Sequence, residues 1–366
     1  MNPVDDTRFT RPLIKALRSH VDAFTHDLAE QAGHEHGRRS YTDQETLRPC
    51  AVSWVYYSVL VAWAADHKLI APWWSKRGVE GAQQLGLSPR EHLKAAYGCL
   101  ITHPATECLG DARYSQLAEG TPSDQVCAEL ITWWRDHAPS LAWQTPDAGP
   151  RSIDGWLAGD LLQALSIERN KTFALAQTPW WVADFIIDHT LIPAAAEFRD
   201  EPVLRTVDPA AGTGHFLIRM VDYLWELYTT GSLASRQGKG GPRVDGYPTV
   251  GPVEAARRIL AGVHGMERDP LTAAVARLRM VVTLGERLHQ AGHLPTLTLR
   301  TIPASVRPVV GVGDSLLWGV IEPEKYTKLH PLLAEIQPPP PVGHTQTHPE
   351  PATIVSAQLD LFQETA

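Results

Sequence analysis

Residues 203–218, VLRTVDPAAGTGHFLI, hold the residue types and spacing that most directly suggest chemistry. The apolar, β-branched run 203–207 is typical of a buried parallel strand. Asp208 ends that strand, and Gly212 and Gly214 allow the backbone to turn sharply before a segment with helical periodicity begins. A strand, a glycine-rich turn and a helix N-terminus in this order form a cradle for a nucleotide-like ligand.

The carboxylate of Asp208 narrows the kind of ligand that this cradle suits. The dinucleotide fingerprint is not met, because Leu217 stands at the position of its third glycine. A carboxylate at the end of the strand repels a phosphate, whereas it attracts the ammonium group of a methionine moiety. The local chemistry therefore favours a ligand with a positively charged part.

The string DPAAGTGHFL, residues 208–217, resembles the DPACGSGHFL-type cofactor motif of adenine-specific DNA methyltransferases, which bind S-adenosylmethionine. This resemblance implies the following cofactor-binding residues: Asp208, Pro209, Ala210, Gly212, Gly214 and Phe216. The methyltransferases concerned act in bacterial restriction and phage defence, including the phage growth limitation type.

An upstream segment, residues 173–191, resembles the Q-T-P turn and amphipathic helix that precede the cofactor motif in the same family. The resemblance implies that Thr178 and Pro179 bind the carboxylate end of the cofactor. Thr178 is a natural helix N-cap, and Pro179 suits the first turn of a helix. Trp180 and Trp181 depart from the polar residues usual in the family, and we expect them to pack against the protein.

Two downstream segments follow in the family's order. GMERDPLTAAVARLRM, residues 265–280, resembles the second motif, although Arg268 replaces an apolar residue. Glu267 ends an expected strand, where an acidic residue typically binds ribose hydroxyls. Residues 313–317, GDSLL, follow a third expected strand and resemble the third motif, which implies that Asp314 accepts a hydrogen bond from the adenine amino group.

The catalytic motif of these enzymes, N-P-P-Y or a close variant, is missing from the sequence. In the family its Asn and first Pro accept the protons of the flipped adenine's amino group, and the aromatic residue stacks on the base. The nearest candidate, residues 337–341 (QPPPP), has no aromatic residue after it and is interpreted as a polyproline spacer. We therefore expect no catalytic residue in this chain and a half-sheet with an open edge.

The first part of the chain is expected to be mostly helical. Apolar residues in 11–29 recur every three to four positions, and 47–67 is apolar enough for the central helix of a bundle. Residues 75–81 are expected to interrupt the helices. Ser88, followed by Pro89 and Glu91, has the pattern of a capped helix start. The paired tryptophans near residue 133 are expected to pack in the helical core rather than stack on bases.

These expectations give an α/β protein, in which an N-terminal mostly helical domain precedes a partial Rossmann-like class I S-adenosylmethionine-dependent methyltransferase domain. A long polar insert, residues 229–249, is expected as a loop between the first and second motifs. The expected domains are a helical domain over 1–150, a cofactor-binding domain over 151–320, and a proline-rich linker and C-terminal tail over 321–366.

Composition limits the functional classes further. The chain of 366 residues is 43% hydrophobic and 20% charged, and it lacks an apolar run of membrane-spanning length. The four cysteines lack paired spacing, so ordinary thiols are favoured over a metal site at Cys99, His103 and Cys108, and a reducing cytoplasmic location is expected. The net charge of −8 argues against a self-sufficient DNA binder, so we expect DNA contact to be shared with a second protein.

Three functions remain open from the sequence. The first is the S-adenosylmethionine-binding part of an adenine-specific DNA methyltransferase that needs a partner chain for catalysis and DNA recognition. The alternative is a catalytically inactive regulatory or interaction module that binds the same cofactor. A hydrolase acting through Ser315 has little support, because no G-x-S-x-G elbow is present.

The C-terminal string QLDLF resembles the peptide by which bacterial replication and repair proteins dock onto the sliding clamp. The candidate clamp-binding residues are Gln358, Leu359, Leu361 and Phe362. The competing interpretation is a terminal element that packs on the body of the protein through the same apolar side chains.

Overall fold

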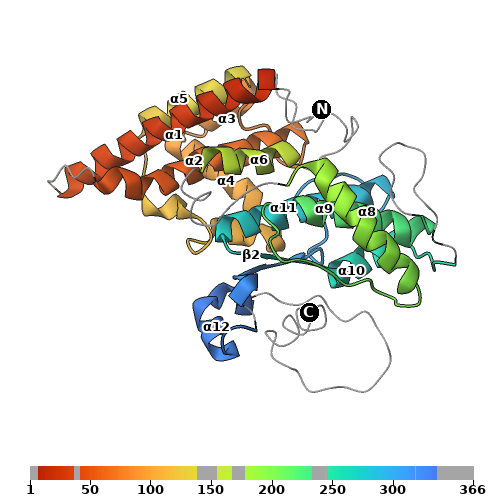
Figure 1. The fold of residues 1–366 in the computed structure, drawn as a ribbon. Helices are drawn as coiled ribbons and strands as arrows, with labels where there is room; N and C mark the ends of the chain where they lie inside the picture. The colour runs from red at the N-terminus through yellow and green to blue at the C-terminus, as the bar shows by residue number, and fades with distance from the viewer. Residues whose placement is uncertain are drawn as a thin grey trace. The chain divides into compact units, whose positions relative to one another are not determined.

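The structure is a computed structural model in which the chain forms two compact units. The first unit is Met1–Ala176 with Leu297–Thr301, and the second is Gln177–Thr296 with Ile302–Ala366. Figure 1 traces the helices and strands of both. The residues described by the structure are 7–36, 42–137, 155–166, 178–232, 244, 246–317 and 319–335.

The first unit is built from helices joined by short 3-10 turns. Its α-helices are α1 (Thr7–His36), α2 (Thr42–Asp66), α3 (Lys76–Gln84), α4 (Pro89–Gly98), α5 (Asp124–His137) and α6 (Trp156–Leu165). Its 3-10 turns are η2 (Cys99–Ile101), η3 (Pro104–Gly110) and η4 (Gln116–Glu119). Helix α2 is buried at every residue from 50 to 64 and packs against α1, α4 and α6, so the expected central helix is confirmed.

Several aromatic side chains of this unit bury their rings while their polar atoms bond to partners inside the unit. Tyr57 Oη donates to the Leu109 carbonyl at 2.6 Å, and Trp134 Nε1 donates to Ser58 Oγ at 2.7 Å. Trp134 is fully buried, which confirms its expected place in the core, whereas Trp133 is half-buried. These internal hydrogen bonds make the burial of large amphipathic side chains favourable.

The structure of this unit bears on two further expectations from the sequence, the break at residues 75–81 and the domain boundary near residue 150. The stretch 75–81 does not interrupt the helices, because Ser75 caps α3 by accepting the Gly78 N–H at 3.1 Å. Helix α6, which lies in the segment assigned from the sequence to the cofactor-binding domain, packs on α1 and α2. The domain boundaries at 150 and 320 stay predictions, while the two compact units divide between residues 176 and 177.

The expected capped start of α4 is confirmed and carries a stability prediction. Ser88 Oγ accepts the Glu91 N–H at 3.4 Å, and Glu91 Oε2 accepts the Ser88 N–H at 2.8 Å. We expect Ser88→Ala to lower the free energy of unfolding by about 1 kcal/mol, because it leaves helix N–H groups without a partner. Urea unfolding measures the change. Ser19→Ala, at an exposed position inside α1, is the control, and an equal loss in both variants would contradict the prediction.

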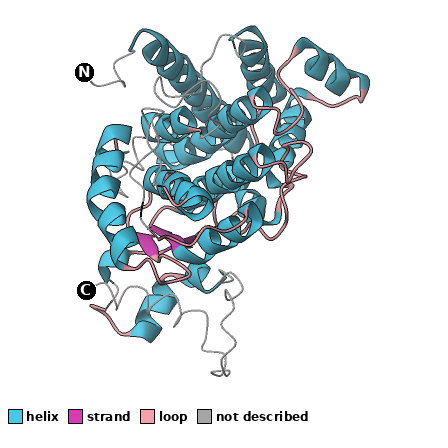
Figure 2. Ribbon diagram, turned by 90° about the vertical axis from the view of Figure 1, so that its right-hand side faces the viewer, coloured by secondary structure: helices cyan, strands magenta, loops and turns pink. Residues whose placement is uncertain are grey.

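The second unit contains a three-stranded parallel sheet in the order β1-β2-β3, and Figure 2 shows how little of the chain is strand. The strands are β1 (Thr206–Asp208), β2 (Val263–Glu267) and β3 (Val309–Val312). The third strand, which the sequence predicts over residues 309–312, has those bounds. The first strand begins three residues later than expected. The Leu204 N–H donates to Tyr228 Oη at 2.9 Å and not to a carbonyl of a neighbouring strand.

Successive side chains of β2 point to opposite faces of the sheet, and different helices pack on the two faces. The helices of this unit are α8 (Trp180–Glu197), α9 (His215–Thr230), α10 (Pro252–Gly262), α11 (Pro270–Gln290) and α12 (Pro323–Leu329), with 3-10 turns η6 (Ser315–Leu317) and η7 (Pro331–Glu335). A Cβ at Gly265 would lie 2.8 Å from Leu217 of α9, so only glycine lets this helix approach so closely. Met266 points the other way and packs with Tyr326 of α12 and Leu333 of η7.

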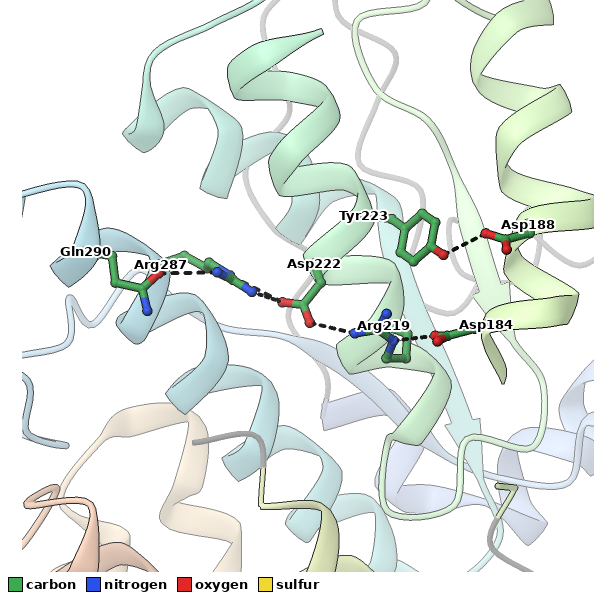
Figure 3. Close-up of polar contacts among 7 residues, drawn as sticks. All are labelled: Asp184, Asp188, Arg219, Asp222, Tyr223, Arg287 and Gln290. Carbon is green, nitrogen blue, oxygen red and sulfur yellow. Dashed lines mark hydrogen bonds and ion pairs between the residues drawn. The ribbon is translucent and has the colours of Figure 1, made fainter. Parts of the chain in front are cut away.

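A polar network joins three of these helices, as Figure 3 shows. Arg219 of α9 bonds Asp184 of α8 at 2.6 Å and Asp222 at 3.3 Å. Asp222 in turn pairs with Arg287 of α11 at 2.7 Å. The side chains of Arg219 and both aspartates are mostly buried, so solvent screens these pairs less than ordinary surface pairs. The network ties α8 and α11 to opposite sides of α9.

One face of α8 departs from the sequence expectation. Trp181 was expected to pack, but it is 50% exposed, and Phe185 one turn later is 60% exposed. The buried stripe of this helix consists of small and aliphatic residues instead: Ala183, Ile187, Leu191 and Ala195. Trp181 lies off that stripe, because residues on one helical face recur every three to four positions.

Candidate functional site

The turn after β1 requires its glycines. Gly212 and Gly214 have φ angles of 54° and 90°, in the left-handed region that side chains disfavour. A Cβ at Gly214 would also lie 3.2 Å from the Cβ of Ala276 on α11. The Ala211 N–H donates to the Met266 carbonyl at 2.8 Å, which holds the turn against the end of β2. The expected strand, glycine-rich turn and helix are therefore present, with Gly214 immediately before α9.

Glu267 joins the turn to the ends of the other two strands. Its Oε2 accepts the Gly212 N–H at 2.9 Å, and its Oε1 accepts the Asp269 N–H at 2.9 Å. Its backbone carbonyl accepts the Gly313 N–H at 2.9 Å, directly after β3. Burial raises the pKa of this carboxyl, although the N–H groups of Asp269 and Gly212 oppose the rise. Since each carboxylate oxygen has two acceptor sites, acceptor capacity toward a ligand remains.

Asp208 is the least satisfied acid of the site. Its Oδ1 accepts the Ala210 N–H at 3.1 Å, while its buried Oδ2 has no hydrogen-bond partner among the described residues. The residue is 7% exposed. Burial raises the pKa of Asp208 to about 6, and the Glu267 carboxylate adds to the rise. A buried carboxylate oxygen without a partner is costly, so a donor or cation at this place would be bound favourably.

Asp314 follows β3 and carries its own set of contacts. Its Oδ1 accepts the Leu316 N–H at 3.1 Å, and its Oδ2 lies 3.2 Å from Arg268 Nε. Tyr326 Oη donates to its backbone carbonyl at 3.1 Å. Thus Asp208, Glu267 and Asp314 stand at the carboxyl ends of β1, β2 and β3, the edge where open α/β sheets bind ligands.

Two buried arginines of α11 support this edge and were missed by the sequence reasoning. Arg279 is fully buried and donates from Nη1 to the Thr213 carbonyl in the glycine-rich turn at 2.7 Å. Arg277 donates to the Val310 carbonyl of β3 from Nε at 3.0 Å and Nη2 at 2.6 Å. The sequence pattern that could have identified them is a pair of arginines inside a long, otherwise apolar helix. A buried charge there is stable only when it has partners.

The remaining candidate residues are exposed or partly buried, or lie outside the described residues. Pro209 and Ala210 are exposed in the turn, and Phe216 is half-buried at the start of α9. Thr178 as the N-cap of α8 is wrong: the cap is Pro179, in an extended conformation and without a side-chain hydrogen bond. The carbonyl of Pro179 accepts the N–H groups of Val182 and Ala183, the third and fourth residues of the helix, at 3.0 and 3.1 Å. The C-terminal residues 358–362 and the QPPPP segment lie outside the described residues.

The cysteines are buried or take part in internal hydrogen bonds. Cys50 and Cys127 are buried, and burial raises the pKa of each thiol to about 12. Cys99 receives a hydrogen bond from Trp73 Nε1 at 3.2 Å. Within the described residues no group of three or more His, Cys, Asp or Glu side chains is arranged to hold a metal ion. Among those same residues, no helix combines the length and apolar character that crossing a membrane requires.

Comparison with curated proteins finds the adenine-specific methyltransferase PglX of Streptomyces coelicolor, which is 30% identical over an alignment of 296 residues and covers 75% of this chain. The chain is related to the adenine-specific methyltransferases. The family resemblance drawn from the sequence motifs is thereby confirmed. The match covers 22% of PglX, so this chain spans about a fifth of that relative's length. No family model and no solved structure matches the chain.

Proposed function

We propose that this chain is the S-adenosylmethionine-binding part of an adenine-specific DNA methyltransferase. The observation that carries the proposal is the placement of one acidic residue at the end of each of three parallel strands or within two residues of it, beside a turn that requires glycine. The relationship to an adenine-specific methyltransferase points to the same cofactor. The sheet order β1-β2-β3 supports a Rossmann-like half-domain, in which ligands lie at the carboxyl ends of the strands.

Each acid has a distinct role in the proposed site. Asp208, with its unpaired buried oxygen, binds the ammonium group of the methionine moiety. Glu267 accepts hydrogen bonds from the ribose hydroxyls, and Asp314 accepts one from the adenine amino group. Gly212 and Gly214 allow the turn beside the proposed site to take its left-handed backbone angles. The three carboxyl groups fit the cofactor, because each can accept a hydrogen bond or attract a positive charge.

Two further candidates complete the proposed site. Thr178 and Pro179 lie immediately before the first turn of α8, whose free N–H groups suit the carboxylate of the methionine moiety. S-adenosylmethionine supplies an activated methyl group when it is bound. The residues of this chain orient the cofactor, and orientation of the reacting groups supplies much of the acceleration in such a transfer.

Catalysis and DNA recognition are proposed to come from a second protein or from further segments. The sequence contains no N-P-P-Y motif or close variant to accept the protons of the target adenine. Within the described residues β1 is paired along one edge only, which leaves its other edge for an added strand. The net charge of −8 is consistent with DNA contacts that are made mainly elsewhere.

The purified chain is expected to bind S-adenosylmethionine but to transfer no methyl group to DNA by itself. Calorimetry measures the binding, and transfer of a labelled methyl group to duplex DNA measures activity. Addition of a second protein that carries an N-P-P-Y segment and binds this chain is expected to produce transfer. Labelled adenine formed by the chain alone, and lost in Asp208→Ala, would contradict the need for a partner. Absence of cofactor binding would contradict the proposed function as a whole, and binding without transfer in any complex would favour the inactive module.

A further inference from the structure

Arg268 is the residue of the second motif that departs from the apolar family pattern, and the structure shows what it contacts. It directly follows Glu267, and its Nε lies 3.2 Å from Asp314 Oδ2. The Arg268 side chain is 50% exposed, whereas that of Asp314 is 14% exposed. The carboxylate proposed to receive the adenine amino group is therefore already paired with a cation from the neighbouring strand end.

Asp314 is the fixed partner of this ion pair. Its Oδ1 is held by the Leu316 N–H, and its backbone carbonyl is held by Tyr326 Oη. The backbone before Asp314 packs closely on Tyr326, since a Cβ at Gly313 would lie 2.8 Å from Tyr326 Oη. Arg268 by contrast has a long, half-exposed side chain, so it is the partner that moves when the pair opens.

We propose that Arg268 is a specificity-determining residue whose guanidinium competes with the adenine amino group for the carboxylate of Asp314. The inference rests on the proposed role of Asp314 in cofactor binding. Arginine donates hydrogen bonds and accepts none, so it opposes a second donor at the same oxygen but can bind a carbonyl. Arg268 therefore lowers the affinity for an adenine ring relative to a hypoxanthine ring, which presents a carbonyl in place of the amino group.

The test compares two ligands that differ at this ring position and at the adjacent N1, which carries a hydrogen in hypoxanthine but not in adenine. S-adenosylhomocysteine and S-inosylhomocysteine are titrated into the whole chain by calorimetry, and both lack the positive sulfur that would respond to any change of charge. Arg268→Gln keeps a polar side chain but removes the cation. Arg257→Gln is the matched control, because Arg257 forms a comparable exposed pair with Glu254 on α10 at 2.8 Å.

We expect Arg268→Gln to bind S-adenosylhomocysteine about two- to fivefold more tightly, the range that corresponds to loss of an exposed ion pair. Binding of S-inosylhomocysteine is expected to stay the same or weaken, so the preference for adenine rises. Arg257→Gln is expected to change neither affinity. In an Asp314→Asn background, Arg268→Gln is expected to have no effect on S-adenosylhomocysteine, because the two residues act on one contact.

The outcomes separate the inference from the proposed function. If wild type binds S-adenosylhomocysteine and Arg268→Gln binds it equally or less tightly, competition by Arg268 is overturned while the cofactor site stands. A gain that persists in the Asp314→Asn background also overturns the inference, because the gain would not act through Asp314. If neither wild type nor Arg268→Gln binds S-adenosylhomocysteine, the proposed function is overturned.

Discussion

Asp208→Asn is expected to weaken S-adenosylmethionine binding at least tenfold at pH 7. The substitution keeps the shape of the side chain but removes the charge that the ammonium group is proposed to pair with. A hydrogen bond to a charged group contributes about 1.5–3 kcal/mol, and about 1.4 kcal/mol corresponds to a factor of ten in affinity. Calorimetry on the folded variant gives the measurement. Glu254→Gln, in the same unit on α10, is the control and is expected to bind as wild type does.

The same residue predicts the pH dependence of binding. Because the pKa of Asp208 is about 6, roughly a tenth of the carboxyl is ionised at pH 5 and most of it at pH 7. A cationic group prefers the ionised form, so affinity is expected to fall roughly tenfold from pH 7 to pH 5. Asp208→Asn should show little of this change. Equal affinity of the wild type at both pH values would argue against Asp208 as the partner of the ammonium group.

Stability is expected to change in the opposite direction. A carboxyl whose pKa is raised by folding binds its proton more tightly in the native state, so the associated stability is present below pH 4 and lost as pH rises through about 6. At pH 7 the buried charge therefore destabilises the ligand-free protein. Asp208→Asn should raise its free energy of unfolding, by on the order of 2–3 kcal/mol. Weaker binding together with greater stability would distinguish a ligand-binding acid from one that supports the fold.

Arg279→Met is expected to lower the free energy of unfolding by about 1.5–3 kcal/mol and to weaken cofactor binding as well. The substitution removes the charged donor that holds the Thr213 carbonyl and leaves that buried acceptor without its partner. Methionine retains much of the volume, so the loss of the hydrogen bond dominates over a cavity. Urea unfolding followed by circular dichroism measures stability, and calorimetry measures binding.

The control for Arg279→Met is Arg257→Met, which removes an arginine with an exposed ion pair from α10. Exposed pairs contribute about 0–1 kcal/mol, so this variant should remain close to wild type. Equal effects of the two substitutions would show that Arg279 does not hold the glycine-rich turn in the way described. Loss of stability with unchanged cofactor affinity would place its role in the fold alone.

Local chemistry explains why several features were predictable from the sequence. A glycine-rich turn between β1 and α9 follows from residues that tolerate left-handed backbone angles, and the capping box of Ser88 and Glu91 follows from a four-residue pattern. The buried run of β-branched residues in β3 identified that strand with its bounds. The methyltransferase motifs are also a property of the sequence, and the similarity to PglX agrees with the family that they indicate.

The tertiary structure decided the contacts between residues far apart in the chain. The Glu267 carboxylate binds the Gly212 N–H, Arg279 binds the Thr213 carbonyl, and no local pattern specifies either bond. In the sequence Arg268 is only a departure from a motif. The pairing of β2 with β3 places it next to Asp314. Packing also decided which face of α8 is buried and that Thr178 does not cap it. Local preferences are worth a few tenths of a kcal/mol to about 1 kcal/mol per residue, whereas burial and charged hydrogen bonds are worth more, so the assembled fold determined these details.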